Sequence, residues 1–260
     1  MSGAALRGLL EAEGEAWPGP IEHHAVLGST SDRLKDWARE GAPELSVVLA
    51  DSQRAGRGRQ GNVWASPPGN SYLSVLLCPE PGRGGLVPLL GGVATCAALA
   101  SLGASARVKW PNDVLVDEKK LAGILAEGSW GARGVEWVTL GIGVNVDPQA
   151  PLPESATSLR AETGRVVSPL IVAAAVLAQV RLWYHALASG RAHELLAAWR
   201  DRSVPWWGRL VLVPVGDQVI RGVATDIDHD GALLVRLADG RLQRVISGEV
   251  SRVRLAAEVD

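Results

Sequence analysis

The sequence predicts an α+β fold, in which a mixed β-sheet with packed helices is followed by a small β-barrel. Strands come first with helices interspersed, and several strands are separated only by hairpin-sized gaps. This pattern favours an α+β arrangement over a doubly wound parallel sheet. After residue 202 the pattern changes to short alternating strands with Asp-Gly pairs between them. We therefore expect a short N-terminal extension over 1–20, a main domain over 21–204 and a barrel over 205–260.

In the first half of the chain, a helix is expected to begin at Ser29 or Thr30 and to end near Gly41. Short apolar or β-branched runs predict strands, and a long Ala/Leu-rich run predicts a buried helix. In chain order these are strands over 45–50 and 72–78, the helix over 86–102, and strands over 107–110, 114–116, 123–127 and 137–146. The acidic first twenty residues have room for one short helix.

In the second half, helices are expected over 169–188 and 192–200, with Pro169 at a first-turn position. The barrel strands are expected over 209–213, 219–226, 232–237, 241–246 and 250–254. Gly216-Asp217, Asp230-Gly231 and Asp239-Gly240 lie between them as turns, and the last two fit tight hairpins.

Composition narrows the class of protein. With 260 residues, 47% of them apolar, and a net charge of −2, the chain has material for a large core but no overall attraction to nucleic acid. No apolar run reaches the roughly 18 residues of a membrane span, and the N-terminus lacks a secretory pattern. Cys78 and Cys96 are expected as buried free thiols, and no Cys/His spacing fits zinc. These features predict a cytoplasmic protein without a membrane partner or a metal held by protein alone.

Residues 56–61 read Gly-Arg-Gly-Arg-Gln-Gly and carry most of the chemical information. Glycines allow close backbone approach to a ligand, and arginines suit carboxylates and phosphates. The spacing also matches a dinucleotide fingerprint, but Pro67 and Pro68 rule out the helix that must follow it, and no P-loop lysine is present. The loop is therefore either an anion clamp or an exposed basic turn.

Two further motifs have both a functional and a structural explanation. Lys109-Trp-Pro-Asn-Asp113, followed by Lys120-Leu-Ala-Gly-Ile-Leu125, predicts a hairpin that brings Asn112, Asp113 and Lys120 to one end of a sheet, or merely a surface hairpin. Gly141-Ile-Gly-Val-Asn-Val146 predicts either close approach of a ligand to a strand or a bulged core strand with a satisfied Asn145.

Taken together and in this order, these motifs resemble the biotin–protein ligase family over residues 22–255, with Ser29-Thr-Ser31 and Gln53 as further matches. The resemblance implies a class II synthetase-like biotin/lipoate ligase catalytic domain followed by an SH3-like barrel. The family usually has Asn where this chain has Ser31. It also places an arginine near the adenylate, a role for which Arg252 and Arg254 compete.

The resemblance implies an ATP-dependent ligase that forms biotinyl-5'-AMP and transfers biotin to a lysine of a biotin carboxyl carrier protein. Arg57, Arg59 and Lys120 would be catalytic. Biotin would be bound by Ser29, Thr30, Ser31, Gln53, Arg57, Gly58, Arg59, Lys120, Gly123 and Ile124. The adenylate would be bound by Arg59, Trp64, Asn112, Asp113, Lys120 and Asn145, with Mg²⁺ held through the phosphates.

Partners are expected to be biotin, ATP and the carrier protein, with a homodimer as an option. Twenty residues before Ile21 are too few for the DNA-binding domain of many relatives, so we expect neither DNA binding nor repression. Two alternatives stay open: a lipoate- or octanoate–protein ligase on a related fold, and a non-catalytic biotin-binding protein.

Overall fold

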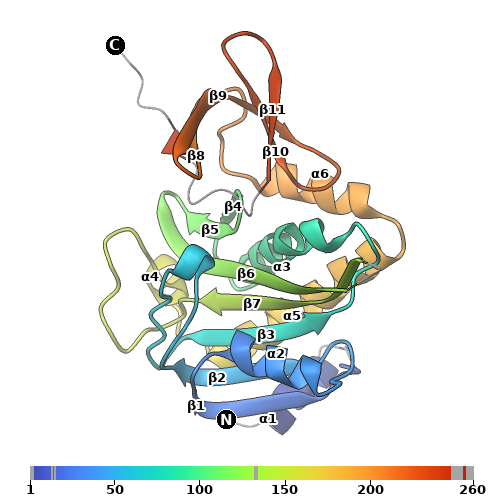
Figure 1. The fold of residues 1–260 in the computed structure, drawn as a ribbon. Coiled ribbons are helices and arrows are strands. Elements are labelled where there is room, and N and C mark those ends of the chain that lie inside the picture. Colours follow the sequence, from blue (N-terminus) through green and yellow to red (C-terminus); the bar gives the residue numbers. More distant parts are fainter. Residues whose placement is uncertain (1–2, 13, 15, 132–133, 247–253, 256–260) are drawn as a thin grey trace.

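The computed structural model describes residues 3–12, 14, 16–131, 134–246 and 254–255. Within these residues, a seven-stranded mixed sheet carries helices on both faces, and a five-stranded antiparallel sheet follows it in the chain (Figure 1). This architecture confirms the predicted α+β class and the small C-terminal β domain.

Helices and strands follow one another in a mixed order. The helices are α1 Gly3–Ala12, α2 Thr30–Arg39, α3 Val87–Ser101, α4 Leu159–Thr163, α5 Pro169–Ala188 and α6 Ala192–Arg202, with 3-10 turns η1 Arg59–Gly61 and η2 Gly84–Leu86. The strands of the large sheet are β1 Ile21–Leu27, β2 Val47–Gln53, β3 Ser71–Leu77, β4 Arg107–Lys109, β5 Asp113–Val116, β6 Lys119–Gly131 and β7 Gly134–Val144. The small sheet contains β8 Leu210–Val215, β9 Gln218–Ile227, β10 Leu233–Arg236, β11 Leu242–Val245 and β12 Arg254–Leu255.

The large sheet has the order β1-β2-β3-β7-β6-β5-β4. Strands β1 and β2 are parallel and joined through α2, whereas the other neighbours are antiparallel. Helix α2 lies on one face of the sheet, and α3 and α5 lie on the other (Figure 1). Covered on both faces, β3 is buried along its whole length.

The N-terminal segment is packed onto the main domain. Helix α1 contacts α5 and β1, with the side chains of Leu6 and Leu10 fully buried. The guanidinium group of Arg7 donates to the backbone carbonyls of Trp17 at 2.7 Å and Gly19 at 2.8 Å. The segment over 1–20 therefore contains the expected short helix, and this helix is part of the core.

Hydrogen bonds from the β4–β5 turn and from α6 join the small sheet to the main domain. The indole N–H of Trp110 donates to the carbonyl of Gly231 at 3.0 Å, and Arg200 donates to the carbonyl of Ile227 at 2.8 Å. Trp110 belongs to the Lys-Trp-Pro-Asn-Asp motif, so one end of this motif rests against the β9–β10 turn. Most of the strand expected over 250–254 lies outside the described residues.

Two sequence expectations about apolar segments need correction. Gly84–Ser101 and Pro169–Ala188 are long and apolar enough to cross a membrane by length and composition, but 67% and 61% of these windows are buried in the protein. Their packing on the sheet identifies them as core helices. Cys96 is buried as expected, whereas Cys78, the first residue after the end of β3, is an exposed free thiol.

Candidate active site

A cavity of about 410 Å³ lies on the α2 side of the large sheet, where β2 ends and the Gly-Arg loop begins. It falls within the volume range of small-molecule sites. Its lining includes every predicted site residue except Asn145: Ser29, Thr30, Ser31, Gln53, Arg57, Gly58, Arg59, Trp64, Asn112, Asp113, Lys120, Gly123 and Ile124. The structure therefore brings together motifs that are widely separated in the sequence.

The end of the cavity next to α2 is neutral and rich in hydroxyl groups. Ser29 caps α2, and its Oγ accepts the backbone N–H of Asp32 at 3.4 Å. The backbone N–H and the hydroxyl of Thr30 both donate to Oε1 of Gln53, at 2.8 and 3.1 Å. Since β1 and β2 are parallel, the turn into α2 and the end of β2 meet at the same edge of the sheet.

The hydroxyl groups form a chain with a fixed direction. Ser74 Oγ donates to Thr30 Oγ1 at 2.9 Å, so the 3.1 Å contact between Ser31 and Ser74 has Ser31 as the donor. Side-chain exposure is at most 5% for these residues and Ser29. Buried groups that satisfy one another in this way hold a single geometry. We name Ser29, Thr30, Ser31, Gln53 and Ser74 the neutral end.

Glycines in β6 and β7 form the floor of the cavity. Gly123 is paired with Gly143 across the two strands, and a Cβ added at either one would lie within 3.0 Å of the Trp64 indole. A Cβ at Gly141 would lie 2.7 Å from Ser31 Oγ. Here glycine is required by the close approach of the Trp64 and Ser31 side chains, while the approach of a ligand to this strand stays a prediction.

A β-bulge orients Lys120. The register of β5 and β6 shifts between Val114 and Leu115, so that Lys120 stands opposite Leu115 and shares a face with Asp113. In a regular ladder this place would belong to Leu121, which is instead fully buried. Bulges commonly redirect side chains next to active sites. Lys120 Nζ lies 2.5 Å from Asp113 Oδ1 and 5.1 Å from the Trp64 ring centroid.

Arg59 is the loop arginine that faces this hairpin. Its Nη1 donates to Oδ1 of Asn112 at 3.3 Å, and Nδ2 of Asn112 donates to the carbonyl of Ile124 at 2.8 Å. Burial lowers the pKa of Arg59, while the Asp113 carboxylate opposes that shift. The guanidinium still stays protonated at physiological pH. We name Arg59, Asn112, Asp113 and Lys120 the charged end.

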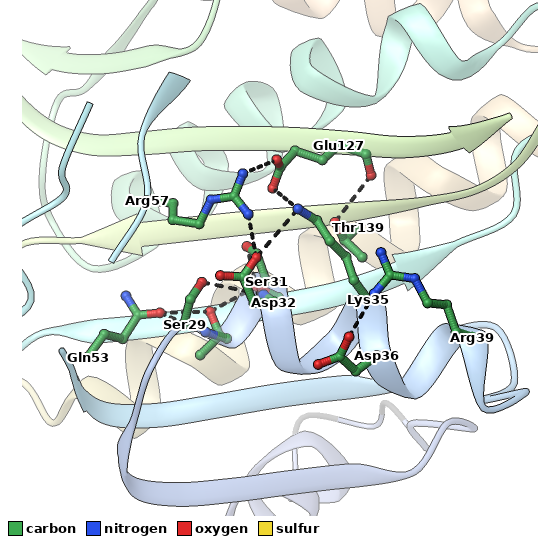
Figure 2. Close-up of polar contacts among 12 residues, drawn as sticks. Ser29, Ser31, Asp32, Lys35, Asp36, Arg39, Gln53, Arg57, Glu127 and Thr139 are labelled. Carbon is green, nitrogen blue, oxygen red and sulfur yellow. Dashed lines mark hydrogen bonds and ion pairs between the residues drawn. The ribbon is translucent and has the colours of Figure 1, made fainter. Parts of the chain in front are cut away.

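Arg57 lies in a different environment from Arg59. Its guanidinium forms ion pairs with Asp32 of α2 and Glu127 of β6, and the Glu127 Oε1 lies 2.5 Å from Nη2 (Figure 2). We expected both arginines to hold phosphate or carboxylate oxygens of the ligands. The structure places Arg57 against two protein carboxylates, which the loop sequence alone does not reveal because Glu127 is 70 positions away.

Asn145 is buried beneath the site rather than lining the cavity. Its side-chain amide donates to the carbonyls of Thr157 at 3.0 Å and Lys120 at 3.4 Å. This arrangement fixes the backbone next to Lys120, so Asn145 supports the charged end, and a contact with the nucleotide stays a prediction. Of the two C-terminal candidates, Arg252 lies outside the described residues, and Arg254 is described only as part of β12.

Sequence reasoning missed several residues of the site. Ser74 lacks any local signal, because a single serine in a buried strand is unremarkable. Gly141 and Gly143 carried a signal as glycines within a strand. Asp32 and Glu127 do not line the cavity; they contact Arg57 beside it and become recognisable only when the loop, α2 and β6 are assembled (Figure 2).

Comparison with known families gives matches over both parts of the chain. Residues 24–145 match the biotin/lipoate A/B protein ligase family, and residues 208–253 match the biotin protein ligase C-terminal domain. The first range contains the neutral end and the charged end of the cavity.

Individual relatives agree with the family matches. The biotin–[acetyl-CoA-carboxylase] ligase of Mycobacterium tuberculosis is 34% identical over 96% of this chain and 95% of its own length. That of Paracoccus denitrificans is 35% identical over 77% of this chain and 89% of its own. Among solved structures, the biotin protein ligase of Aquifex aeolicus in complex with biotin and ATP superposes with a TM-score of 0.78 at 29% identity, covering 91% of this chain and 99% of that one.

Proposed function

The chain belongs to the biotin–protein ligase family, and from this premise we propose that it converts biotin and ATP into biotinyl-5'-AMP and then transfers biotin to a lysine of a carrier protein. It is an ATP-dependent biotin ligase: its relatives are biotin ligases by name, and the Aquifex aeolicus ligase that it resembles in structure binds biotin and ATP. Each step of this reaction has candidate residues in the cavity of the chain.

A single observation carries the assignment: one cavity joins a buried hydroxyl network to a pair of cations. Biotin has the matching two ends, a neutral cyclic urea and a carboxylate. Ser29 Oγ accepts the Asp32 N–H, so its own proton is available for the urea carbonyl. Thr30 Oγ1 donates to Gln53 and accepts from Ser74, which leaves a lone pair for a urea N–H. The neutral end therefore supports biotin recognition.

Between the two ends, Trp64 forms a flat apolar wall of the cavity. Its indole lies directly on Gly123 and Gly143, so close that a Cβ at either glycine would come within 3.0 Å of it. The face of the indole that lines the cavity suits packing against the fused rings of biotin or the adenine base. We assign this wall to the ring end of biotin and the neighbouring rim to the nucleotide.

The charged end is where the reaction takes place. A carboxylate oxygen of biotin attacks the α-phosphorus of ATP, the bond to the β-phosphate oxygen breaks, and pyrophosphate leaves with the bonding electrons. Lys120 and Arg59 are placed to stabilise the charge that gathers on the α-phosphate oxygens. To do so, the ammonium of Lys120 exchanges its Asp113 partner for ligand oxygens.

In the second step, the neutral amine of the acceptor lysine attacks the carbonyl carbon of the mixed anhydride. An amide bond forms, AMP leaves as its phosphate anion, and the amine loses a proton. Before that step the anhydride has to be kept from water. The Gly-Arg loop lies over the cavity, with the N–H of Gly58 bonded to the carbonyl of Asn62 at 2.7 Å and that of Trp64 to Gly56 at 2.9 Å. We assign it the role of the lid.

Magnesium fits the donor groups of this site. Asp113 and Glu118 line the cavity as carboxylates, and Mg²⁺ in nucleotide sites is held by one or two carboxylates together with the phosphates. Asp113 would hold such an ion, which would supply positive charge to the phosphates.

Less detail can be proposed for three further properties: the acceptor protein, the oligomeric state and the location in the cell. A biotin carboxyl carrier protein follows from the names of the relatives, whereas a homodimer, the lack of DNA binding and a cytoplasmic location stay predictions. The division into catalytic residues 21–204 and C-terminal residues 205–260 is likewise a proposal. It is supported by the gap between the end of α6 at Arg202 and the start of β8 at Leu210.

Biotin-dependent exchange of pyrophosphate into ATP tests the proposal and both alternatives. Exchange with biotin is the expected outcome, and its absence would contradict an enzymatic function and favour a non-catalytic biotin-binding protein. Lipoate lacks a urea, so it would leave the hydroxyl network of the neutral end without its polar partner. Exchange with lipoate but not with biotin would show that the substrate is wrong.

A further inference from the structure

Four charged residues tie the Gly-Arg loop to the body of the protein. Arg57 of the loop pairs with Asp32 and with Glu127, whose second oxygen lies 2.7 Å from Lys35 Nζ. Lys35 Nζ also lies 3.6 Å from Asp32 Oδ1. Two cations thus alternate with two anions in a closed, neutral ring of contacts (Figure 2).

Three of these residues sit on rigid elements. Asp32 and Lys35 are one turn apart on α2, and Glu127 lies in β6, where its carbonyl accepts the hydroxyl of Thr139 at 3.2 Å. The side chains of Glu127 and Lys35 are only 23% and 15% exposed, and those of Arg57 and Asp32 are 39% and 47% exposed. Partly desolvated pairs with several partners contribute more than isolated surface pairs. Arg57 is the member that belongs to the loop.

Internal hydrogen bonds hold the loop together as one unit. Its backbone is closed upon itself by the hydrogen bonds of Gly58 and Trp64, and Asn62 donates a backbone N–H to Arg59 at 3.0 Å. A contact that fixes Arg57 therefore also fixes Arg59 above Asn112 and Trp64 above the glycine floor. The ring of ion pairs can therefore influence the position of Arg59 and Trp64 in the cavity, although Asp32, Lys35 and Glu127 do not contact the reacting atoms.

We propose that Asp32, Lys35, Arg57 and Glu127 form a latch that holds the lid closed, and that Asp32 and Glu127 are positioning residues that set how long biotinyl-AMP stays bound. This inference rests on the proposed function, since it concerns the intermediate of that reaction. It assigns the two loop arginines different tasks: Arg59 faces the ligand, and Arg57 anchors the lid.

Release of biotinyl-AMP from the full-length enzyme tests the latch. The wild-type enzyme is loaded with radiolabelled biotin and ATP, separated from free ligand, and followed for loss of label. Failure of the wild type to form the intermediate would refute the function itself, not the latch. With the intermediate formed, Glu127→Gln and Asp32→Asn should each release it about fivefold faster, because each removes one ion pair to Arg57 while keeping the side-chain shape.

A matched control lies on the same helix. Asp36 pairs with Arg39 at 2.7 Å one turn further along α2 from Asp32, where both side chains are exposed and neither contacts Arg57. Asp36→Asn should leave release within about twofold of wild type, because exposed pairs contribute little. The rate of biotinyl-AMP formation at saturating substrates and the melting temperature should be unchanged in Glu127→Gln, which a merely structural role would not allow.

Salt gives a second, independent readout. Raising the KCl concentration from about 0.05 M to 0.5 M should accelerate release from the wild type, because ions screen the pairs of the latch. The Asp32→Asn/Glu127→Gln double variant should show a much weaker salt response. The latch is refuted if this double variant retains biotinyl-AMP as long as wild type, or if its release depends on salt as strongly.

Discussion

The two ends of the cavity are built on different principles. The neutral end uses side chains at the start of α2, on β2 and on β3, and its hydroxyl-bearing members are at most 5% exposed. Ser31, Ser74 and Thr30 are bonded to one another, and Ser29 is bonded to the backbone of α2. The charged end uses long side chains, and Lys120 and Asp113 are 31% and 25% exposed. Groups locked by their neighbours recognise one shape, whereas flexible cations can follow charge as it moves during a reaction. Recognition and catalysis are thus separated along a single ligand.

Removing the lysine cation should have the largest effect. Lys120→Gln keeps the length of the side chain but not its charge, so biotinyl-AMP formation should fall by about 100-fold or more, while biotin affinity changes far less. Pyrophosphate exchange measures the first quantity and calorimetry the second.

Lys119→Gln is the matched control, because the exposed Lys119 stands opposite Val116 on the other face of the hairpin. Near-normal pyrophosphate exchange in Lys120→Gln would disprove the catalytic role of Lys120. It would also contradict the assignment of catalysis to the charged end of the cavity.

Removing the amide of Gln53 should weaken biotin binding while leaving the reaction rate nearly unchanged, the opposite of Lys120→Gln. Gln53→Ala deprives the Thr30 N–H and hydroxyl of their acceptor, so biotin should bind about 30-fold more weakly, while the turnover rate at saturating biotin stays close to wild type. Ser52→Ala is the control, since the Ser52 hydroxyl donates to the carbonyl of Ala25 at 3.3 Å. A loss of turnover as large as the loss of affinity would mean that the two ends are not separate.

The loop arginine should show an intermediate behaviour. Arg59→Gly removes the contact to Asn112, so biotinyl-AMP should leave the enzyme about tenfold faster and label bystander lysines. Retention of the intermediate for as long as in wild type would rule out the lid. Arg54→Gly is a suitable control, because Arg54 is an exposed residue at the start of the same loop.

The smallest effect is expected from a substitution in the glycine floor, which lies between the two ends of the cavity. In Gly143→Ala the new methyl group would lie 2.7 Å from the Trp64 Nε1, so the indole has to move by a few tenths of an ångström to make room. Biotin and ATP affinities should each weaken by about fivefold, with the melting temperature nearly unchanged. Gly128→Ala is the control, because its closest neighbour would be the Trp137 carbonyl at 3.4 Å. An effect on one ligand alone would place Trp64 at one end of the cavity.

Local sequence patterns predicted much of this architecture. Helix α5 begins at Pro169 and ends at Ala188 as expected. Its start is set locally by the capping Ser168 and by Pro169, and the apolar run that follows is continuous in the sequence. The Gly-Arg loop, Gln53 and Lys120 were placed in one site by resemblance to a family.

The parts that sequence could not predict depend on contacts over long separations. The bulge that exposes Lys120 rather than Leu121 is a property of how β5 pairs with β6, and neither strand signals it alone. The pairing of Arg57 with Glu127 requires that the lid, α2 and β6 be assembled. Charged residues on their own indicate a solvated surface, so such partners become visible only in three dimensions.

The parallel pair of β1 and β2 has a consequence for the order in which the site is assembled. Ser29, Thr30, Ser31 and Gln53 lie in one continuous β1–α2–β2 unit, and Ser74 follows on β3, the next strand of the sheet. The contacts of the neutral end therefore close before residue 75 of the chain. The charged end has to wait for Arg59 and the hairpin around Lys120 to converge, which involves larger sequence separations and slower folding. We therefore expect a growing chain to complete the part that recognises biotin before the part that activates it.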